Sequence, residues 1–226
     1  MTVDIKICGL SDDAGIDAAI GDIASAETRY VGLVFFSKSP RNVNLEQARH
    51  LADRARGRAK VVALMVDPDN ALIDEVNAQV APDLLQLHGH EPVERVKEIR
   101  QRTSRRIIKA IGVATAEDVE SAASYFAPDR AADIILFDAK PPANGELPGG
   151  NGLTFDWRVL ANAPDWAKGR FMLSGGLTPE NVAEAVARTG PAAVDVSSGV
   201  ETAPGKKSPQ LIERFIRAVK TAKQRS

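Results

Sequence analysis

Hydrophobic and polar positions follow two alternating rhythms along this chain. Short runs dominated by hydrophobic residues are each followed by a longer segment in which hydrophobic residues recur every three or four positions. The short runs have the composition of β-strands, and the longer segments have the period of amphipathic helices. The pattern predicts strands at residues 4–8, 30–35, 60–65, 84–87, 106–111, 134–138, 171–174 and 193–197.

Each predicted strand is followed by a segment that has the features of a helix. The predicted helices begin near Ser11, Leu45, Asp69, Pro92, Thr115, Phe155, Glu180 and Pro209. Asp69 is expected to cap its helix, and Pro179 falls in the expected first turn of the helix near Glu180. The chain is thus predicted to be a series of strand–helix units.

Eight such units without an evident linker favour the α/β class and a single (β/α)₈, or TIM, barrel domain over residues 1–226. An open doubly wound sheet is the alternative, and it usually carries a G-x-G-x-x-G turn after the first strand. Here Cys8-Gly9-Leu10-Ser11 follows that strand and lacks the spacing. In a barrel, functional groups are expected where the strands end.

Charge and cysteine content exclude several classes of partner. The formal net charge is −1 with a single cysteine, so neither nucleic acid nor an anionic membrane is an expected partner. A disulfide framework and a cysteine-based zinc cluster are not expected either. The N-terminus lacks the pattern of a signal peptide, and no apolar stretch approaches the ~18 residues of a membrane span. We expect a cytoplasmic protein.

Two glycine-containing segments follow the last two predicted strands. Gly175 and Gly176 come after the seventh strand, and Ser198 and Gly199 come after the eighth. In many barrels these two loops hold a phosphate through backbone N–H groups and hydroxyls. The alternative is that the glycines only form tight turns. The pair of loops favours a phosphorylated small molecule as substrate.

Two candidate acid–base groups lie at the ends of strands on different sides of the expected barrel. Cys8 ends the first strand and Asp138 the sixth. Cys8 is either a small buried hydrophobe or a reactive thiol. Asp138 is either a residue that caps a helix or tethers a loop, or a general acid whose protonated form is favoured by an apolar surrounding. A base and an acid facing one substrate suit a proton-transfer isomerisation.

Charged residues on the first and eighth strands are expected to meet inside the barrel. Lys6 shares a strand face with Cys8, and Asp195 lies on the neighbouring last strand, so the two should pair. We expect this pair to be mainly structural. A cation so close to Cys8 would lower the pKa of the thiol.

His88 and His90 flank Gly89 after the fourth predicted strand and superficially resemble a metal site. Two histidines without a third ligand of matching spacing fall short of a catalytic zinc set. No metal is therefore expected. We interpret His88 as a polar residue at the rim of the substrate site.

An ordered set of motifs resembles the phosphoribosylanthranilate isomerase family of tryptophan biosynthesis. The motifs extend from the first strand to the last, so the resemblance covers essentially the full chain. They are KICGL at 6–10, GLVFF at 32–36, SPR at 39–41, QLHG at 86–89, FD at 137–138, GGNGLTFDW at 149–157, LSGGL at 173–177 and DVSSGVE at 195–201. The stretch at 204–207 also fits, although its lysines could belong to a solvated turn.

The resemblance implies an isomerase in a (β/α)₈ barrel that needs neither cofactor nor metal. Enzymes of this family catalyse an Amadori rearrangement of N-(5′-phosphoribosyl)anthranilate to 1-(2-carboxyphenylamino)-1-deoxyribulose 5-phosphate. By motif, Cys8 matches the family's general base, which removes the C2′ proton. Asp138 matches the general acid, which protonates the ring oxygen. Arg41 matches the arginine that holds the anthranilate carboxylate. The phosphate would be held at Gly175, Gly176, Ser198 and Gly199.

Two alternatives and two departures remain open. A related isomerase of histidine biosynthesis runs the same type of rearrangement, but it uses Asp where this chain has Cys8 and needs a second phosphate site. A catalytically silent phosphosugar-binding barrel is the other alternative. Asn151 stands where the family pattern has Thr, and Leu153 where a polar residue is frequent. Both could affect loop closure. A monomer and a homodimer are equally compatible with the sequence.

Overall fold

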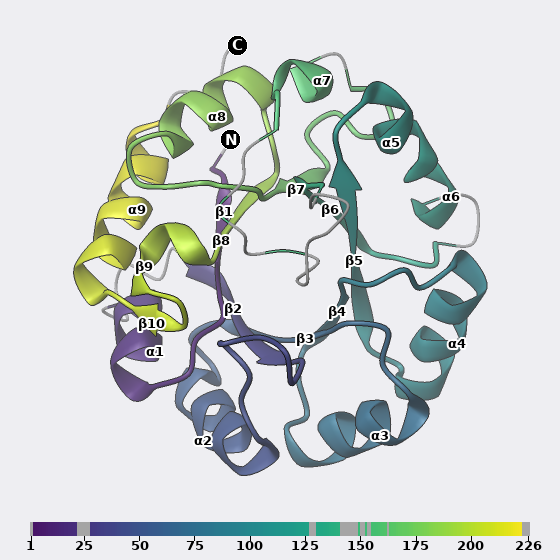
Figure 1. The fold of residues 1–226 in the computed structure, drawn as a ribbon, viewed down its shortest axis with the longest axis vertical. Coiled ribbons are helices and arrows are strands. Elements are labelled where there is room, and N and C mark those ends of the chain that lie inside the picture. The colour runs from purple at the N-terminus through teal and green to yellow at the C-terminus, as the bar shows by residue number, and fades with distance from the viewer. Residues whose placement is uncertain are drawn as a thin grey trace.

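Eight parallel strands form a closed barrel surrounded by helices (Figure 1). The computed structural model describes residues 2–21, 28–126, 130–140, 149, 152, 155–161 and 163–222. Each strand pairs with its neighbours in chain order, and β1 closes the ring against β8. The predicted barrel is confirmed, and the open doubly wound sheet is wrong.

The strands of the barrel agree closely with the predicted runs. Their bounds are β1 Asp4–Cys8, β2 Thr28–Phe35, β3 Lys60–Met65, β4 Leu84–Leu87, β5 Arg106–Val113, β6 Ile134–Ala139, β7 Phe171–Leu173 and β8 Ala193–Val196. The helices are α1 Asp13–Ile20, α2 Leu45–Ala55, α3 Asn70–Gln79, α4 Val93–Thr103, α5 Ala116–Ser121, α6 Ala123–Phe126, α7 Arg158–Ala161, α8 Val182–Thr189 and α9 Pro209–Thr221. A short hairpin of β9 Glu201–Ala203 and β10 Lys206–Lys207 follows β8.

The helix starts show where the local signals act. Asp69 caps α3 as predicted, because its carboxylate accepts from the backbone N–H of Leu72 at 2.9 Å. The helix expected near Glu180 begins only at Val182, with Asn181 as its N-cap. Pro179 therefore lies in the turn before α8 and not in its first turn, so that prediction was wrong.

The barrel strands are buried on both faces. Outward side chains such as Ile5, Leu85 and Phe137 pack with the helices in one large core. Inward side chains form a second, smaller core that includes Val62 and Leu136. The next layer toward the strand ends holds Cys8, Val34 and Leu64. These side chains thus fill the barrel interior, and polar groups gather beyond them at the carboxyl ends of the strands.

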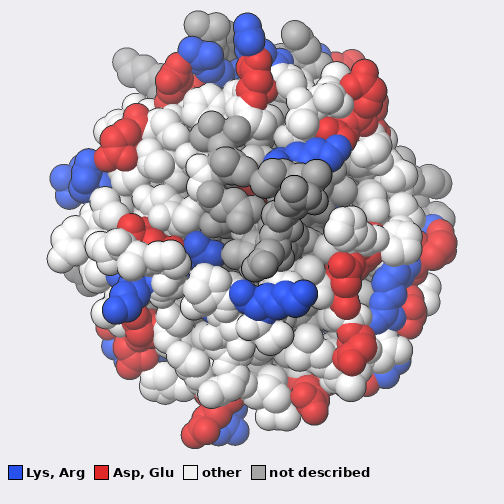
Figure 2. Space-filling view, in the orientation of Figure 1, with Lys and Arg blue, Asp and Glu red and all other residues white. Residues whose placement is uncertain are grey.

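Charges on the face in view are mixed. Figure 2 shows basic and acidic side chains interspersed around its rim, without a large patch of one sign. Within the described ranges, no helix has both the length and the apolar character needed to cross a bilayer.

Candidate active site

One cavity at the carboxyl ends of the strands collects all eight of the predicted site residues. Its lining includes Cys8, Arg41, His88, Asp138, Gly175, Gly176, Ser198 and Gly199. They come from elements as distant in sequence as β1 and the turn after β8. Closure of the barrel is what brings them together.

Cys8 sits at the end of β1 with a side chain that is almost fully enclosed. Its register partner on β2 is Gly32. A Cβ at Gly32 would lie 2.9 Å from the Cys8 Sγ and 3.1 Å from the Lys6 Nζ. The absence of a side chain at this position therefore gives the thiol and the ammonium their space.

The predicted pair between Lys6 and Asp195 is confirmed. The two residues are register partners on β1 and β8, and the Lys6 Nζ lies 2.8 Å from the Asp195 Oδ1 in a fully buried contact. The Ser174 hydroxyl donates to the other carboxylate oxygen at 3.3 Å. Burial opposes the charged form of Lys6, but Asp195 and Cys8 outweigh it and raise the pKa of the ammonium. Lys6 stays cationic beside the thiol.

The expected lowering of the Cys8 pKa is wrong in its net direction. Burial penalises the thiolate and raises the pKa of Cys8, and the nearby charge of Asp195 acts in the same sense. Lys6 does lower it, as expected, but less than burial raises it. The sequence predicted the neighbouring cation but did not show how completely the thiol is buried.

Asp138 ends near the rim of the cavity and is 5% exposed. Its Oδ1 accepts from the backbone N–H of Ala139 at 2.9 Å, and its Oδ2 lies 3.2 Å from the Nε2 of His88. Gly149 passes directly over both, because a Cβ there would come within 2.7 Å of each atom. Asp138 contacts a histidine and caps no helix among the described elements. The sequence placed both residues at strand ends but did not indicate this contact.

Arg41 also lines the cavity and is held by a carboxylate to which the sequence analysis assigned no role. Its Nε and Nη2 donate to the two oxygens of Glu201 at 2.7 and 2.9 Å. The Lys207 Nζ lies 2.6 Å from the same carboxylate. Burial acts to raise the pKa of Glu201, but Arg41 and Lys207 outweigh it and lower that pKa. Lys207 is therefore part of a buried cluster, whereas Lys206 is exposed.

The two glycine-containing loops after β7 and β8 are packed against each other and against β6. Gly175 has a φ of 90°, and a Cβ there would lie 2.7 Å from the backbone nitrogen of Ala139. A Cβ at Gly199 would collide with the Leu177 carbonyl. Close approach of the backbones thus requires glycine at both positions. Residues of both loops also line the cavity, including Gly176 and Ser198.

Nothing in the structure bears on the two departures from the family pattern. Asn151 and Leu153 are outside the described residues. Within the part of the chain that the structure describes, no three His, Cys, Asp or Glu side chains are grouped as a metal site requires.

The fold and the cavity define the class of this protein. It is a (β/α)₈-barrel enzyme in which a thiol and a carboxyl group from different strands face one site. The family model described as N-(5′-phosphoribosyl)anthranilate (PRA) isomerase matches residues 5–218. The chain belongs to this family of isomerases.

Full-length relatives and solved structures agree with that assignment. The chain is 47% identical over 223 residues to N-(5′-phosphoribosyl)anthranilate isomerase of Mesorhizobium japonicum, covering 99% of this chain and 98% of the relative. It is 50% identical over 225 residues to that of Parvibaculum lavamentivorans, covering 98% and 100%. The crystal structure of phosphoribosyl anthranilate isomerase from Thermotoga maritima superimposes with a TM-score of 0.79 at 37% identity, covering 97% and 99%.

A further solved structure holds a ligand. It is a phosphoribosyl anthranilate isomerase in complex with reduced 1-(o-carboxyphenylamino)-1-deoxyribulose 5-phosphate. This chain matches it with a TM-score of 0.77 at 35% identity, and the match covers 97% of this chain and 99% of the other.

Proposed function

We propose that this chain rearranges N-(5′-phosphoribosyl)anthranilate to 1-(2-carboxyphenylamino)-1-deoxyribulose 5-phosphate, with Cys8 as general base and Asp138 as general acid. The reaction is a step of tryptophan biosynthesis. The observation that carries the assignment of roles is the common cavity lined by Cys8 from β1 and Asp138 from β6. Membership of the isomerase family over nearly the whole chain supports it.

The two groups divide the proton transfers between them. Asp138 gives its proton to the furanose ring oxygen as the bond from that oxygen to C1′ breaks. Cys8, as thiolate, then takes the proton from C2′, and the resulting enolamine becomes the ketose. The Lys6 ammonium beside Cys8 stabilises the thiolate that burial disfavours. No covalent bond to the enzyme is formed.

Two ends of the substrate have separate anchors. We assign Arg41 the anthranilate carboxylate, since a guanidinium meets a carboxylate with parallel hydrogen bonds. Its contacts with Glu201 fix the plane of the guanidinium at the cavity. We assign the phosphate to the N–H groups and hydroxyl of Gly175, Gly176, Ser198 and Gly199. His88 borders the same space, and we place it against the substrate beside Asp138.

The setting in which the enzyme works is also part of the proposal. We infer that residues 1–226 act as one domain, in the cytoplasm, on a small phosphorylated substrate and without nucleic acid or membrane. The phosphoribosylanthranilate isomerase of Thermotoga maritima is dimeric, and a crystal structure of monomers generated from it is also known. A monomer and a homodimer are both compatible with the site, because every proposed site residue comes from one chain.

Substitution of the two proposed acid–base residues tests the assignment. Purified protein should consume phosphoribosylanthranilate without added metal or nucleotide. Cys8→Ala and Asp138→Ala should each lower turnover at least ~100-fold, the scale of general acid or base catalysis. Normal turnover in Cys8→Ala would contradict the mechanism. Failure of the unmodified chain to rescue growth of a strain lacking this step would contradict the function.

A further inference from the structure

Gln86 is a fully buried amide that the proposed mechanism does not use. It lies in β4, with Leu64 of β3 and Ile108 of β5 as its register partners. Its exposed fraction is 0%, and both partners are buried apolar residues. An amide in such surroundings is costly unless its hydrogen bonds are made.

The amide of Gln86 bonds to one ring nitrogen of His88. The Gln86 Nε2 lies 3.0 Å from the His88 Nδ1. An amide nitrogen carries hydrogens and only donates, so the Nδ1 must be the acceptor. In a neutral imidazole the proton then resides on the Nε2. Gln86 therefore selects one tautomer of His88.

The ring nitrogen that is protonated in this tautomer faces Asp138. The His88 Nε2 is 3.2 Å from the Asp138 Oδ2, with side chains 11% and 7% exposed. Gly149 closes over the contact, because a Cβ there would lie 2.7 Å from both atoms. The ring thus has a fixed neighbour on each nitrogen. The three side chains form a continuous series from the barrel interior to the proposed acid.

We propose that Gln86 is a positioning residue that acts through His88: it holds the ring in the Nε2–H tautomer, and the ring in turn orients the Asp138 carboxyl group toward the substrate. The inference rests on the acid role proposed for Asp138. Asp138 must present a proton to the ring oxygen and afterwards exist as a carboxylate. A neutral imidazole whose protonated Nε2 lies 3.2 Å from Oδ2 stabilises the negative charge that then develops on the carboxylate.

The other half of the amide has no partner among the residues that the structure describes, because the buried Gln86 Oε1 accepts no hydrogen bond from them. A buried acceptor without a partner destabilises the fold. Methionine would remove that acceptor but would also leave the His88 Nδ1 without its donor, so the two effects on stability oppose each other. We therefore expect methionine at this position to preserve stability while releasing the ring.

The principal test compares Gln86→Met with Leu84→Met. Leu84 is an equally buried inward residue two positions earlier on β4, and its substitution controls for a change in core shape. Gln86→Met should lower kcat about tenfold or more, because a reacting group loses its fixed geometry. KM should stay within about twofold and the melting temperature within about 2 °C. Leu84→Met should leave kcat close to that of the unmodified enzyme.

A spectroscopic measurement tests the tautomer directly, without relying on activity. The chain contains three histidines, so ¹⁵N ring resonances can be assigned by the loss of one set in His88→Asn. The unmodified enzyme should show a protonated Nε2 and an unprotonated Nδ1 at His88. Gln86→Met should show a mixture of the two tautomers. A protonated Nδ1 in the unmodified enzyme would overturn the inference, as would an unchanged spectrum in the variant.

A double-variant cycle separates action through His88 from a direct effect. In a His88→Asn background, Gln86→Met should cause no further loss of kcat. A full additional loss there would show that Gln86 acts elsewhere. These experiments also distinguish a failure of this inference from a failure of the proposed function. If the unmodified enzyme is active and Asp138→Ala is not, unchanged kcat in Gln86→Met refutes only the positioning role.

Discussion

Two of the buried lysines lie on barrel strands, each beside a carboxylate, on opposite faces of the same sheet. Lys6 points inward and lies 2.8 Å from Asp195, with side chains 0% and 5% exposed. Lys109 points outward toward the helices and lies 2.7 Å from Glu91, with side chains 2% and 1% exposed. The two ion pairs are nearly identical in distance and in burial. They differ in the residues that surround them, and therefore in function.

The inner pair is part of the electrostatics of the site. Lys6 and Asp195 join the neighbouring strands β1 and β8 at one level of the barrel, and Cys8 follows Lys6 by two residues along β1. Lys6 lowers the Cys8 pKa against the larger effect of burial, and Asp195 raises it. Burial and the balance of these two charges together set how much of Cys8 is thiolate.

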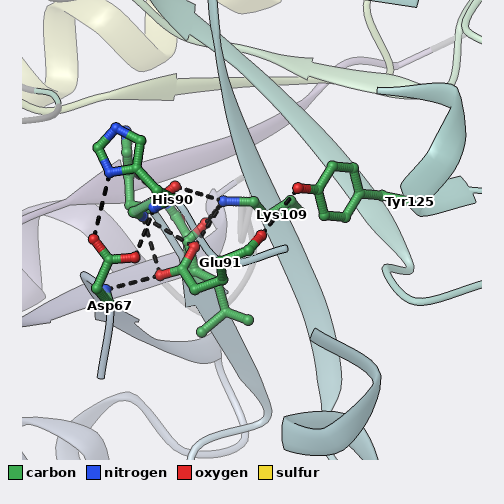
Figure 3. Close-up of polar contacts among 9 residues, drawn as sticks. Asp67, His90, Glu91, Lys109 and Tyr125 are labelled. Atoms are coloured by element: carbon green, nitrogen blue, oxygen red, sulfur yellow. Dashed lines mark hydrogen bonds and ion pairs between the residues drawn. The ribbon is translucent and has the colours of Figure 1, made fainter. Parts of the chain in front are cut away.

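The outer pair supports a loop instead. Figure 3 shows the Lys109 ammonium directed at the carboxylate of Glu91 and at the chain that follows β4. The ammonium donates to the Gly89 carbonyl at 2.8 Å, while Glu91 accepts from the backbone N–H groups of Asp67 and Gly89. The Tyr125 hydroxyl donates to the Glu91 carbonyl at 2.9 Å. This cluster fixes the segment that begins with His88.

The comparison teaches that a buried ion pair has no function by itself. Removal of one partner should destabilise either pair, since an uncompensated buried charge remains. Removal of both partners should restore stability in each case. Only the outer pair should then retain activity, and this difference can be measured.

The largest effect on activity is expected at the inner pair. Lys6→Met leaves the Asp195 carboxylate buried without its cation, which should cost about 3–5 kcal/mol in the free energy of unfolding. It also removes the charge that favours the thiolate, so kcat/KM should fall about 100-fold or more. Denaturant titration and steady-state kinetics measure the two quantities.

The matched double variant, Lys6→Met with Asp195→Asn, separates the two effects. It should recover most of the lost stability, because no lone charge is left in the barrel. It should not recover activity, because Cys8 still lacks its cation. Full activity in the double variant would show that the pair is only structural, whereas the sequence predicted a mainly structural pair with some influence on the Cys8 thiolate.

The pH dependence should be the next largest effect. A thiol with a raised pKa is mostly protonated near neutral pH, so the active thiolate increases as the pH rises. We expect kcat/KM to rise by about tenfold per pH unit until the raised pKa of Cys8 is reached. Lys6 keeps its charge over this range because its own pKa is also raised.

Comparison with the inner double variant sharpens this prediction. This variant lacks both charges, and Lys6 lowered the Cys8 pKa more than Asp195 raised it, so the rising limb should move to higher pH. The matched double variant of the outer pair, Glu91→Gln with Lys109→Met, should keep the rising limb of the unmodified enzyme. A flat profile in the unmodified enzyme would argue against a thiolate base.

The sequence predicted the barrel and the strand-end residues because both depend on local periodicity. Cys8 and Asp138 were found at the ends of apolar runs, and Lys6 and Asp195 were paired from strand parity and ring closure. Depth was not predictable in this way. The net direction of the Cys8 pKa shift depends on how completely the surrounding layers enclose the thiol, which no single strand records.

The contacts of loops were also beyond the sequence. His88 and Asp138 meet across the cavity, and Glu201 meets Arg41 and Lys207 through a hairpin whose position depends on the whole fold. The roles of Gln86 and Glu91 follow only from their neighbours. The QLHG motif contains two of the residues in the proposed positioning series, but motif matching does not say which atoms they bond.

The outer pair should show the smallest effect on activity. Glu91→Gln should cost about 3–5 kcal/mol of stability, because Lys109 is left buried without its counter-charge. Adding Lys109→Met should recover most of this loss. The glutamine carbonyl still accepts from a loop N–H, so kcat of the double variant should remain within about threefold of that of the unmodified enzyme. A loss as large as that of the inner double variant would mean that the loop after β4 depends on charge as well as on its hydrogen bonds, and the two pairs would then be equivalent in their effect on catalysis.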